Sequence, residues 1–283
     1  MKHQPLHTKL LLCAALAAAF LLTLQAARAQ DYPVRLPDQV TRKSFALGSA
    51  PFVKLDNVNG KLLVVGDGGS QVSLTATETI RAQSEDLARQ AQRQVTLQVR
   101  TTGDSLEVYV DGPFRGRHWE NPGYEVSFAL ELHVPAAARV NAGSVNGKVT
   151  LQDVGGAFQA QTVNGAVEVA GARAAGSAHT VNGSIKADFN AVPRADCSFH
   201  TVNGSIHLTL PRDVNAVLLY KTFNGAVYTD FAVTPLPEAA AASQSGGMRV
   251  FRRHRQGRGQ IGRGGPTLTV NTLNGSIYIK RGM

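Results

Sequence analysis

The chain has 283 residues, with a formal net charge of +9, 28 glycines and only 6% aromatic residues. A chain of this length can bury a substantial core, and many glycines beside many Val, Thr and Ile residues favour an all-β fold with frequent tight turns. Six arginines and no acidic residue lie between Arg249 and Arg263, so most of the positive charge is local. The composition therefore excludes a uniformly basic surface and, with two cysteines, a disulfide-rich scaffold.

Residues 1–29 have the pattern of a secretory signal peptide. Basic residues precede an apolar run from Leu10 to Leu24, and Ala27-Arg28-Ala29 is a small-x-small cleavage site before Gln30. An uncleaved membrane anchor is the alternative, but the run is shorter than the roughly 20 residues that a spanning helix needs. We therefore expect export to the periplasm, the cell surface or the medium, with no transmembrane span after cleavage.

Cleavage changes both the charge and the cysteine count. Residues 1–29 carry three of the basic residues and no acidic ones, which leaves +6 of the original +9. Cys197 is then the only cysteine, so no intramolecular disulfide can form. We expect it to be a small buried apolar residue and not a nucleophile.

A short motif recurs along the chain. Thr-Val-Asn-Gly-Ser-Ile occurs at Thr180–Ile185 and at Thr201–Ile206, and near copies share its Asn-Gly pair. The Asn-Gly pairs begin at residues 59, 146, 164, 182, 203, 224 and 274. A steady period near 20 residues predicts a solenoid with one turn per repeat, in which residues one repeat apart are neighbours. Seven hairpins are the alternative, because Asn-Gly favours the type I′ turn, but a meander would turn every 8–12 residues.

We predict an all-β fold, a right-handed β-solenoid or β-helix-like stack of 18–21-residue repeats. Apolar residues in phase with each Asn flank the corner, so Asn and the preceding Thr are expected to point inward and stack as ladders. Glycine after Asn is expected to supply a positive φ. The predicted ladder residues are Asn146, Gly147, Asn164, Gly165, Asn182, Gly183, Asn203, Gly204, Asn224, Gly225, Asn274 and Gly275.

The opposite phase forms an apolar column beside the corner. Its members are Val145, Val163, Val181, Val202, Phe223 and Leu273. If Asn points inward, these side chains point outward. The column is then either covered by another segment, which we favour, or a contact surface.

The sequence divides into a signal peptide (1–29), an N-terminal β-rich half (30–135) that caps or extends the stack, and the repeat region (136–283). A short helix is predicted over about 84–94, with Ser84 as its cap. The predicted strands are Phe52–Val58, Leu62–Val65, Val72–Ile80, Val95–Thr101, Leu106–Val110 and Tyr124–Val134. Residues 235–266 have no periodic pattern of apolar residues and few large apolar side chains, and we expect a disordered or loosely helical insertion.

Together these features resemble the bacterial DUF4097 family, whose members carry a β-strand repeat and are provisionally labelled adhesins. The resemblance rests on the exported N-terminus, the Asn-x-Asn-Gly turn at residues 57–60, the Val134-Pro135 step and the tandem Thr-Val-Asn-Gly units. It covers about residues 45–283 except 235–266. It implies a right-handed β-helix-like fold and carries over no catalytic residue.

Two outward columns contain chemically interesting side chains. One consists of Gln161, His179, His200 and Lys221, and the other of Thr150, Glu168, Lys186, His207, Tyr228 and Tyr278. A stack of two histidines without a third ligand is a weak metal signal, so we predict no metal site. The tyrosines either stack on sugar rings or pack simply on the surface. No catalytic motif is present, so we predict no catalytic residue, no cofactor and no enzyme.

The arginine-rich segment is a candidate anion-binding site. Its arginines are Arg249, Arg252, Arg253, Arg255, Arg258 and Arg263. A similar segment in a cytosolic protein suggests RNA, but in an exported protein the anionic partners are lipids, lipopolysaccharide phosphates or acidic polysaccharides, and we expect no nucleic acid. A solvated loop without a partner is the alternative.

The leading functional hypothesis is a non-catalytic structural or interaction protein of the cell envelope, with an envelope protein, an anionic lipid or a polysaccharide as partner. A polysaccharide-binding or polysaccharide-cleaving β-helix is the second hypothesis. An accessory of envelope stress or signalling is the third.

Overall fold

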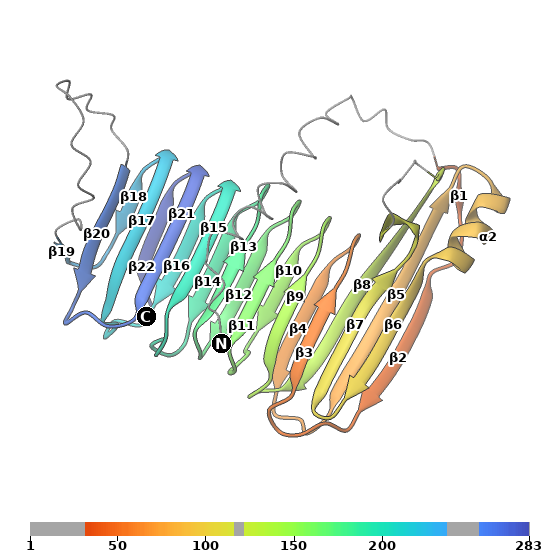
Figure 1. Cartoon of the computed structure of the whole chain (residues 1–283), viewed down its shortest axis with the longest axis horizontal. Helices are drawn as coiled ribbons and strands as arrows, with labels where there is room; N and C mark the ends of the chain where they lie inside the picture. Colours follow the sequence, from red (N-terminus) through yellow and green to blue (C-terminus); the bar gives the residue numbers. More distant parts are fainter. Residues whose placement is uncertain (1–31, 116–121, 237–254, 283) are drawn as a thin grey trace, which may run out of the picture.

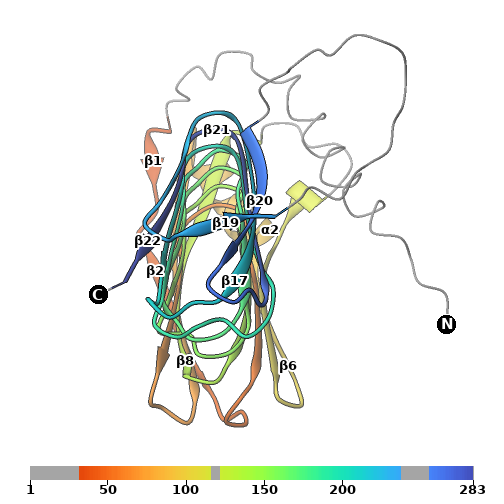
Figure 2. The same ribbon diagram turned by 90° about the vertical axis from the view of Figure 1, so that its left-hand side faces the viewer.

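The computed structural model describes residues 32–115, 122–236 and 255–282. The chain is all-β, and most of the described elements are strands of two open mixed sheets of 11 strands each. Figure 2 looks along the length of the molecule and shows the two sheets facing each other. The predicted signal peptide lies outside the described residues.

Sheet A runs in the order β1-β5-β8-β4-β10-β12-β14-β16-β22-β18, with β2 also paired to β5. Its strands are β1 Val34–Arg35, β2 Gln39–Phe45, β4 Leu62–Asp67, β5 Val72–Ala82, β8 Tyr124–Pro135, β10 Val149–Gln152, β12 Val167–Ala172, β14 Ile185–Phe189, β16 Ile206–Leu210, β18 Val227–Thr229 and β22 Ile277–Arg281.

Sheet B runs in the order β19-β20-β17-β21-β15-β13-β11-β9-β3-β7-β6. Its strands are β3 Phe52–Asp56, β6 Thr96–Thr102, β7 Ser105–Asp111, β9 Arg139–Gly143, β11 Phe158–Gln161, β13 Gly176–His179, β15 Cys197–Asn203, β17 Ala216–Asn224, β19 Val233–Pro235, β20 Arg255–Ile261 and β21 Thr267–Asn274.

Each repeat contributes one layer to the stack. A layer consists of a strand of sheet B, a corner with the pattern Thr-x-Asn-Gly, and a strand of sheet A. Successive layers pair in parallel and in register, so that Val167 is the partner of Val149 on one side and of Ile185 on the other. Because these strands are short, a layer buries too little apolar surface to be stable alone and depends on its neighbours.

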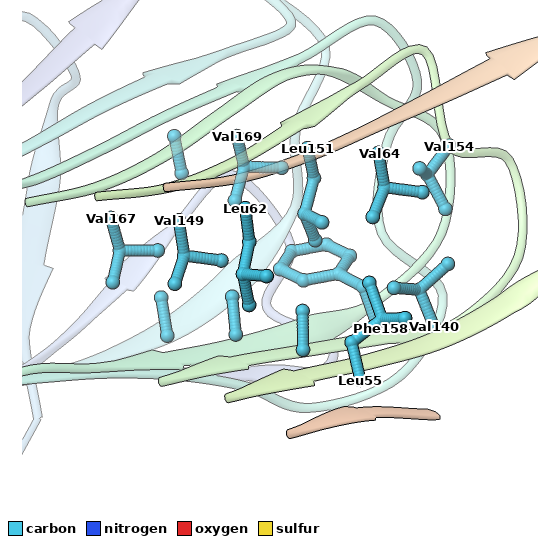
Figure 3. Packing of buried hydrophobic residues seen from close by; sticks show 14 of the residues in the cluster. Leu55, Leu62, Val64, Val140, Val149, Leu151, Val154, Phe158, Val167 and Val169 are labelled. Carbon is cyan, nitrogen blue, oxygen red and sulfur yellow. The ribbon is translucent and has the colours of Figure 1, made fainter. Parts of the chain in front are cut away.

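The core lies between the sheets. Side chains that alternate inward from both sheets meet there, as predicted for the residues in phase with the corner threonines. Figure 3 shows Leu55, Val140 and Phe158 from sheet B facing Leu62 and Leu151 from sheet A. All five side chains are buried. This continuous apolar column joins one layer to the next.

The layers do not follow the order of the sequence. The last layer, β21–β22, lies between the β15–β16 layer and the β17–β18 layer, so that Leu268 pairs with Cys197 on one side and Leu218 on the other (Figure 1). The prediction that the repeat at residue 224 stacks directly on the repeat at residue 203 is therefore wrong. All corners are chemically alike, so the period alone cannot fix their order, and a longer connection costs little additional loop entropy.

Strand β17 has a pairing partner on each of its two edges. Strand β20 pairs antiparallel with one edge of β17, and β21 pairs parallel with the other edge. The connection 262–266 joins these two strands near Asn215, whose Oδ1 accepts a hydrogen bond from the backbone N–H of Arg263 at 2.8 Å. Strand β17 is thus held on both edges by two consecutive strands.

This arrangement corrects part of the predicted disordered insertion. Residues 255–261 form strand β20 and do not belong to a disordered loop. They were missed because pairing with an open sheet edge uses the backbone and does not require apolar periodicity. Residues 237–254 of the predicted insertion lie outside the described residues.

The other end of the stack is built by the N-terminal half. The β3–β4 layer pairs with the β9–β10 layer, so the corner at Asn59 stacks on the corner at Asn146. Helix α2 (Glu85–Gln94) covers this end, where Ala88 and Ala91 are buried. Ser84 caps the helix as predicted, its Oγ accepting from the N–H of Leu87. The short 3-10 helix η2 spans Pro113–Arg115.

Candidate interaction surfaces

The corners are joined by a continuous chain of asparagine amides. In each layer the Asn Nδ2 donates a hydrogen bond to the Oδ1 of the Asn in the adjacent layer. The bonds are Asn146 to Asn59 (2.8 Å), Asn164 to Asn146 (2.8 Å), Asn182 to Asn164 (2.9 Å), Asn203 to Asn182 (2.8 Å), Asn274 to Asn203 (2.7 Å) and Asn224 to Asn274 (2.7 Å). Because all six bonds point the same way, they polarise one another and fix the register of the layers.

The asparagines lie on the outside of the corner, and the prediction that they point inward is wrong for them. The threonines are the buried members. Each Thr hydroxyl donates to the carbonyl of the corner glycine in the adjacent layer, for example from Thr180 to Gly165 at 2.8 Å and from Thr201 to Gly183 at 2.8 Å. An exposed amide can also bond to water, whereas a buried hydroxyl needs an acceptor within the protein.

The corner glycines are required for a different reason from the predicted one. Among the corners of the repeat region, only Gly275 has a positive φ that L side chains rarely adopt. A Cβ on Gly183 would lie 1.9 Å from the backbone oxygen of Gly165, and a Cβ on Gly204 would lie 2.0 Å from that of Gly183. The glycines form a column in which the backbone of one layer contacts the next, so no side chain fits.

The first two layers depart from this pattern. Asn57 stands where the other corners have Thr or Ser, and its Nδ2 donates to the carbonyl oxygens of Phe128 (2.8 Å) and Gly60 (3.2 Å). Ser144, at the threonine position of the next layer, has a buried Oγ with no hydrogen-bond partner in the described structure. The sequence prediction did not include Asn59 and Gly60 in the ladder, although their Asn-x-Asn-Gly pattern marked them.

The apolar column beside the asparagines is only partly buried. Val145, Val163 and Val181 are half-buried, but Val202 is 37% exposed and Leu273 is 46% exposed. Phe223 continues the column at 55% exposure. Exposure therefore increases toward the β17–β18 end of the stack.

The outward face of sheet B contains two stacked histidines. His179 and His200 pair in register on β13 and β15, with ring centroids 5.1 Å apart and an interplanar angle of 4°. The next side chain in this column is Asn271, whose Nδ2 lies 3.2 Å from Nδ1 of His200, so Lys221 is not adjacent to His200 as the sequence order suggested. Burial lowers the pKa of His179, and burial together with the charge of His179 lowers the pKa of His200 to about 4. Both rings are therefore neutral near pH 7.

The outward face of sheet A contains a ladder of three aromatic rings, which we call the aromatic ladder. His207, Tyr278 and Tyr228 lie in register on β16, β22 and β18. The ring centroids of His207 and Tyr278 are 4.6 Å apart, and those of Tyr278 and Tyr228 are 5.0 Å apart. Further along the same face, Lys148 and Glu168 form an ion pair at 2.7 Å.

The predicted anion-binding arginines are only partly within the described residues. Arg249, Arg252 and Arg253 lie outside them. Arg255 begins strand β20, Arg258 is exposed on that strand, and Arg263 is exposed in the connection to β21. The described arginines are thus spread along strand β20, which lies between β17 and the edge strand β19, and along a turn.

The described residues contain no group of three or more His, Cys, Asp or Glu side chains that could hold a metal ion. Cys197 is buried, and burial raises the pKa of its thiol. No helix in the described part of the chain is long and apolar enough to cross a membrane.

Comparison with known proteins gives structural neighbours only. No family model and no curated protein matches the sequence. A crystal structure from Clostridium sporogenes, described provisionally as a cell adhesion protein, aligns over 86% of this chain and 100% of its own, with 10% identity and a TM-score of 0.42. A provisionally named adhesin from Bacteroides fragilis aligns over 86% and 97%, with 10% identity and a TM-score of 0.38.

Proposed function

We propose that the chain is an exported, non-catalytic interaction protein of the cell envelope, an adhesin-like right-handed β-solenoid of the DUF4097 type. The observation that carries this proposal is the registered stack. The ladder from Asn59 to Asn224 and the parallel pairing fix equivalent side chains one strand spacing apart on both outward faces. A stack of this kind holds its outward side chains at a fixed spacing over an extended surface, which suits binding to a large partner.

The proposal includes the location of the mature protein. Cleavage after Ala29 would release a chain that begins at Gln30 into the periplasm or to the cell surface. The pattern of basic residues, apolar run and small-x-small site in residues 1–29 supports it.

The test is a glycan and envelope-component binding screen on the mature chain, with each bound component also incubated for product analysis. We expect retention of at least one envelope component and no new reducing ends or unsaturated products. Cleavage of any bound polysaccharide would overturn the proposal in favour of an enzyme. If circular dichroism shows that the protein is folded and it still binds no component, the proposal is also contradicted.

A further inference from the structure

The aromatic ladder ends at an open edge of the molecule. Strand β18 is the last strand of sheet A in the described structure, and Tyr228 is its central residue. One face of the Tyr228 ring stacks on Tyr278, and the side chain is 54% exposed. The opposite face of the ring therefore has no strand beside it within the described residues. A flat aromatic surface with an edge in solvent can accept another ring at stacking distance.

One lysine beside the ladder has no ion pair within the described residues. Lys280 lies two residues after Tyr278 on the same outward face of β22, and it makes no ion pair within the described residues. Lys186 is the register partner of His207 on β14, where it pairs with Asp188 at 3.3 Å. Partial burial, followed by the charges of Lys280 and Lys186, lowers the pKa of His207. Asp188 balances Lys186, and Asp230 lies just after β18, where its Oδ2 accepts from the N–H of Arg281. Lys280 is therefore the cation beside the ladder that remains to meet an anionic ligand.

We propose that the aromatic ladder, together with Lys280, binds an acidic polysaccharide whose anionic group is a carboxylate. A sugar ring would stack on the free face of Tyr228, and Lys280, one strand further in on β22, would pair with the carboxylate of a neighbouring uronate in the same polymer. Parallel strands lie about 4.8 Å apart, so a polymer that runs along the stack meets a new side chain at each layer. This inference rests on the proposed function and names its ligand class.

The proposal requires both a ring and a charge, which separates it from binding through charge alone. A phospholipid surface or a polyphosphate offers anionic groups but no sugar ring to stack on Tyr228. A neutral glycan offers the ring without the carboxylate. The outward Lys148 provides a matched control, because it lies on the same face but its ion pair with Glu168 neutralises it.

The test is isothermal titration of the full mature chain with an oligogalacturonate, and with the same oligomer after methyl esterification. We expect the ester to bind at least tenfold more weakly. Tyr228→Ala should weaken oligogalacturonate binding at least tenfold, whereas Tyr228→Phe, which keeps the ring, should stay within about twofold. Lys280→Gln should weaken binding and reduce its salt dependence, and Lys148→Gln should change neither.

Unchanged affinity in either Tyr228→Ala or Lys280→Gln would overturn the proposal, as would equal affinity for the acid and the ester. Absence of oligogalacturonate binding would also overturn it, while retention of a different component in the envelope screen would leave the proposed function standing. Cleavage of the oligomer would instead overturn the proposed function.

Discussion

Single atoms decide whether a residue fits the corner. Three positions of the Thr-x-Asn-Gly corner have different requirements: a buried hydroxyl, an exposed amide and a glycine against the backbone of the adjacent layer. Thr180, Asn182 and Gly183 show all three within one corner.

Replacement of a corner glycine should destabilise the protein through steric overlap. In Gly183→Ala the new Cβ would lie 1.9 Å from the Gly165 oxygen, so the layers must separate locally. We expect a loss of about 3 kcal/mol in the free energy of unfolding, measured by urea denaturation. Gly68→Ala is the matched control, because nothing lies within 4 Å of its added Cβ. A stability equal to that of the control would refute the close-contact explanation.

Two hydroxyls at equivalent positions should respond in opposite ways. Thr180→Val removes the donor to the Gly165 carbonyl and should cost about 1–3 kcal/mol. Ser144→Ala removes a buried hydroxyl that has no partner in the described structure, so the unfolding free energy should stay the same or increase. Chemical denaturation of both variants provides the measurement. A larger loss for Ser144→Ala than for Thr180→Val would contradict this assignment.

These residue requirements were only partly predictable from sequence. The ladder and the need for glycine followed from the repeat, because the same letters returned at a nearly constant interval. The direction of Asn182 did not follow, because an amide that bonds to its own kind can be either buried or exposed. The reason for glycine at position 183 also did not follow, because the sequence of one repeat does not show how closely the backbone of the adjacent layer approaches it.

At the scale of the element, strand pairing determines which side chains become neighbours. His179 and His200 stack because β13 and β15 are in register, and Asn271 follows because β21 is inserted next to β15. The histidine pair could be predicted from adjacent repeats, whereas Asn271 could not, because it lies about 70 residues further along the chain.

The histidine stack should make stability depend on pH. The folded-state pKa values of both rings lie below the ordinary value of 6.5, so the unfolded chain takes up protons first as the pH falls. Stability is therefore fully present above about pH 6.5 and decreases toward pH 4. His200→Gln should flatten this dependence in thermal unfolding measured from pH 7.5 to 4. An unchanged slope in the variant would exclude the stack as its cause.

At the scale of the whole molecule, the order of layers differs from the order of repeats. The sequence indicated an all-β fold, the period of the repeat and a short helix over about 84–94, because these depend on local patterns. It could not indicate that the β21–β22 layer enters between two earlier layers. The position of this layer depends on the pairing of β20 and β21 with the two edges of β17, which are contacts between segments that are distant in the sequence.

This order predicts an unusual pattern of hydrogen exchange. Chain termini usually exchange quickly, but the β21–β22 layer has pairing partners on both sides and buries Val270 and Ile279. We expect its amides to exchange as slowly as those of β14 and more slowly than those of the edge strand β18. Amide exchange followed by mass spectrometry tests this. Faster exchange in β21 and β22 than in β18 would contradict the inserted position.

The inserted layer also bears on synthesis of the protein. A ribosome releases residues 216–229 before residues 267–281, yet the later segment separates the earlier one from residues 197–210. Growth of the native stack therefore cannot proceed strictly from the N-terminus to the C-terminus. Until residues 267–281 have been synthesised, β17 and β18 lack the strands that join them to the rest of the stack, so this part of the fold cannot be completed earlier in synthesis.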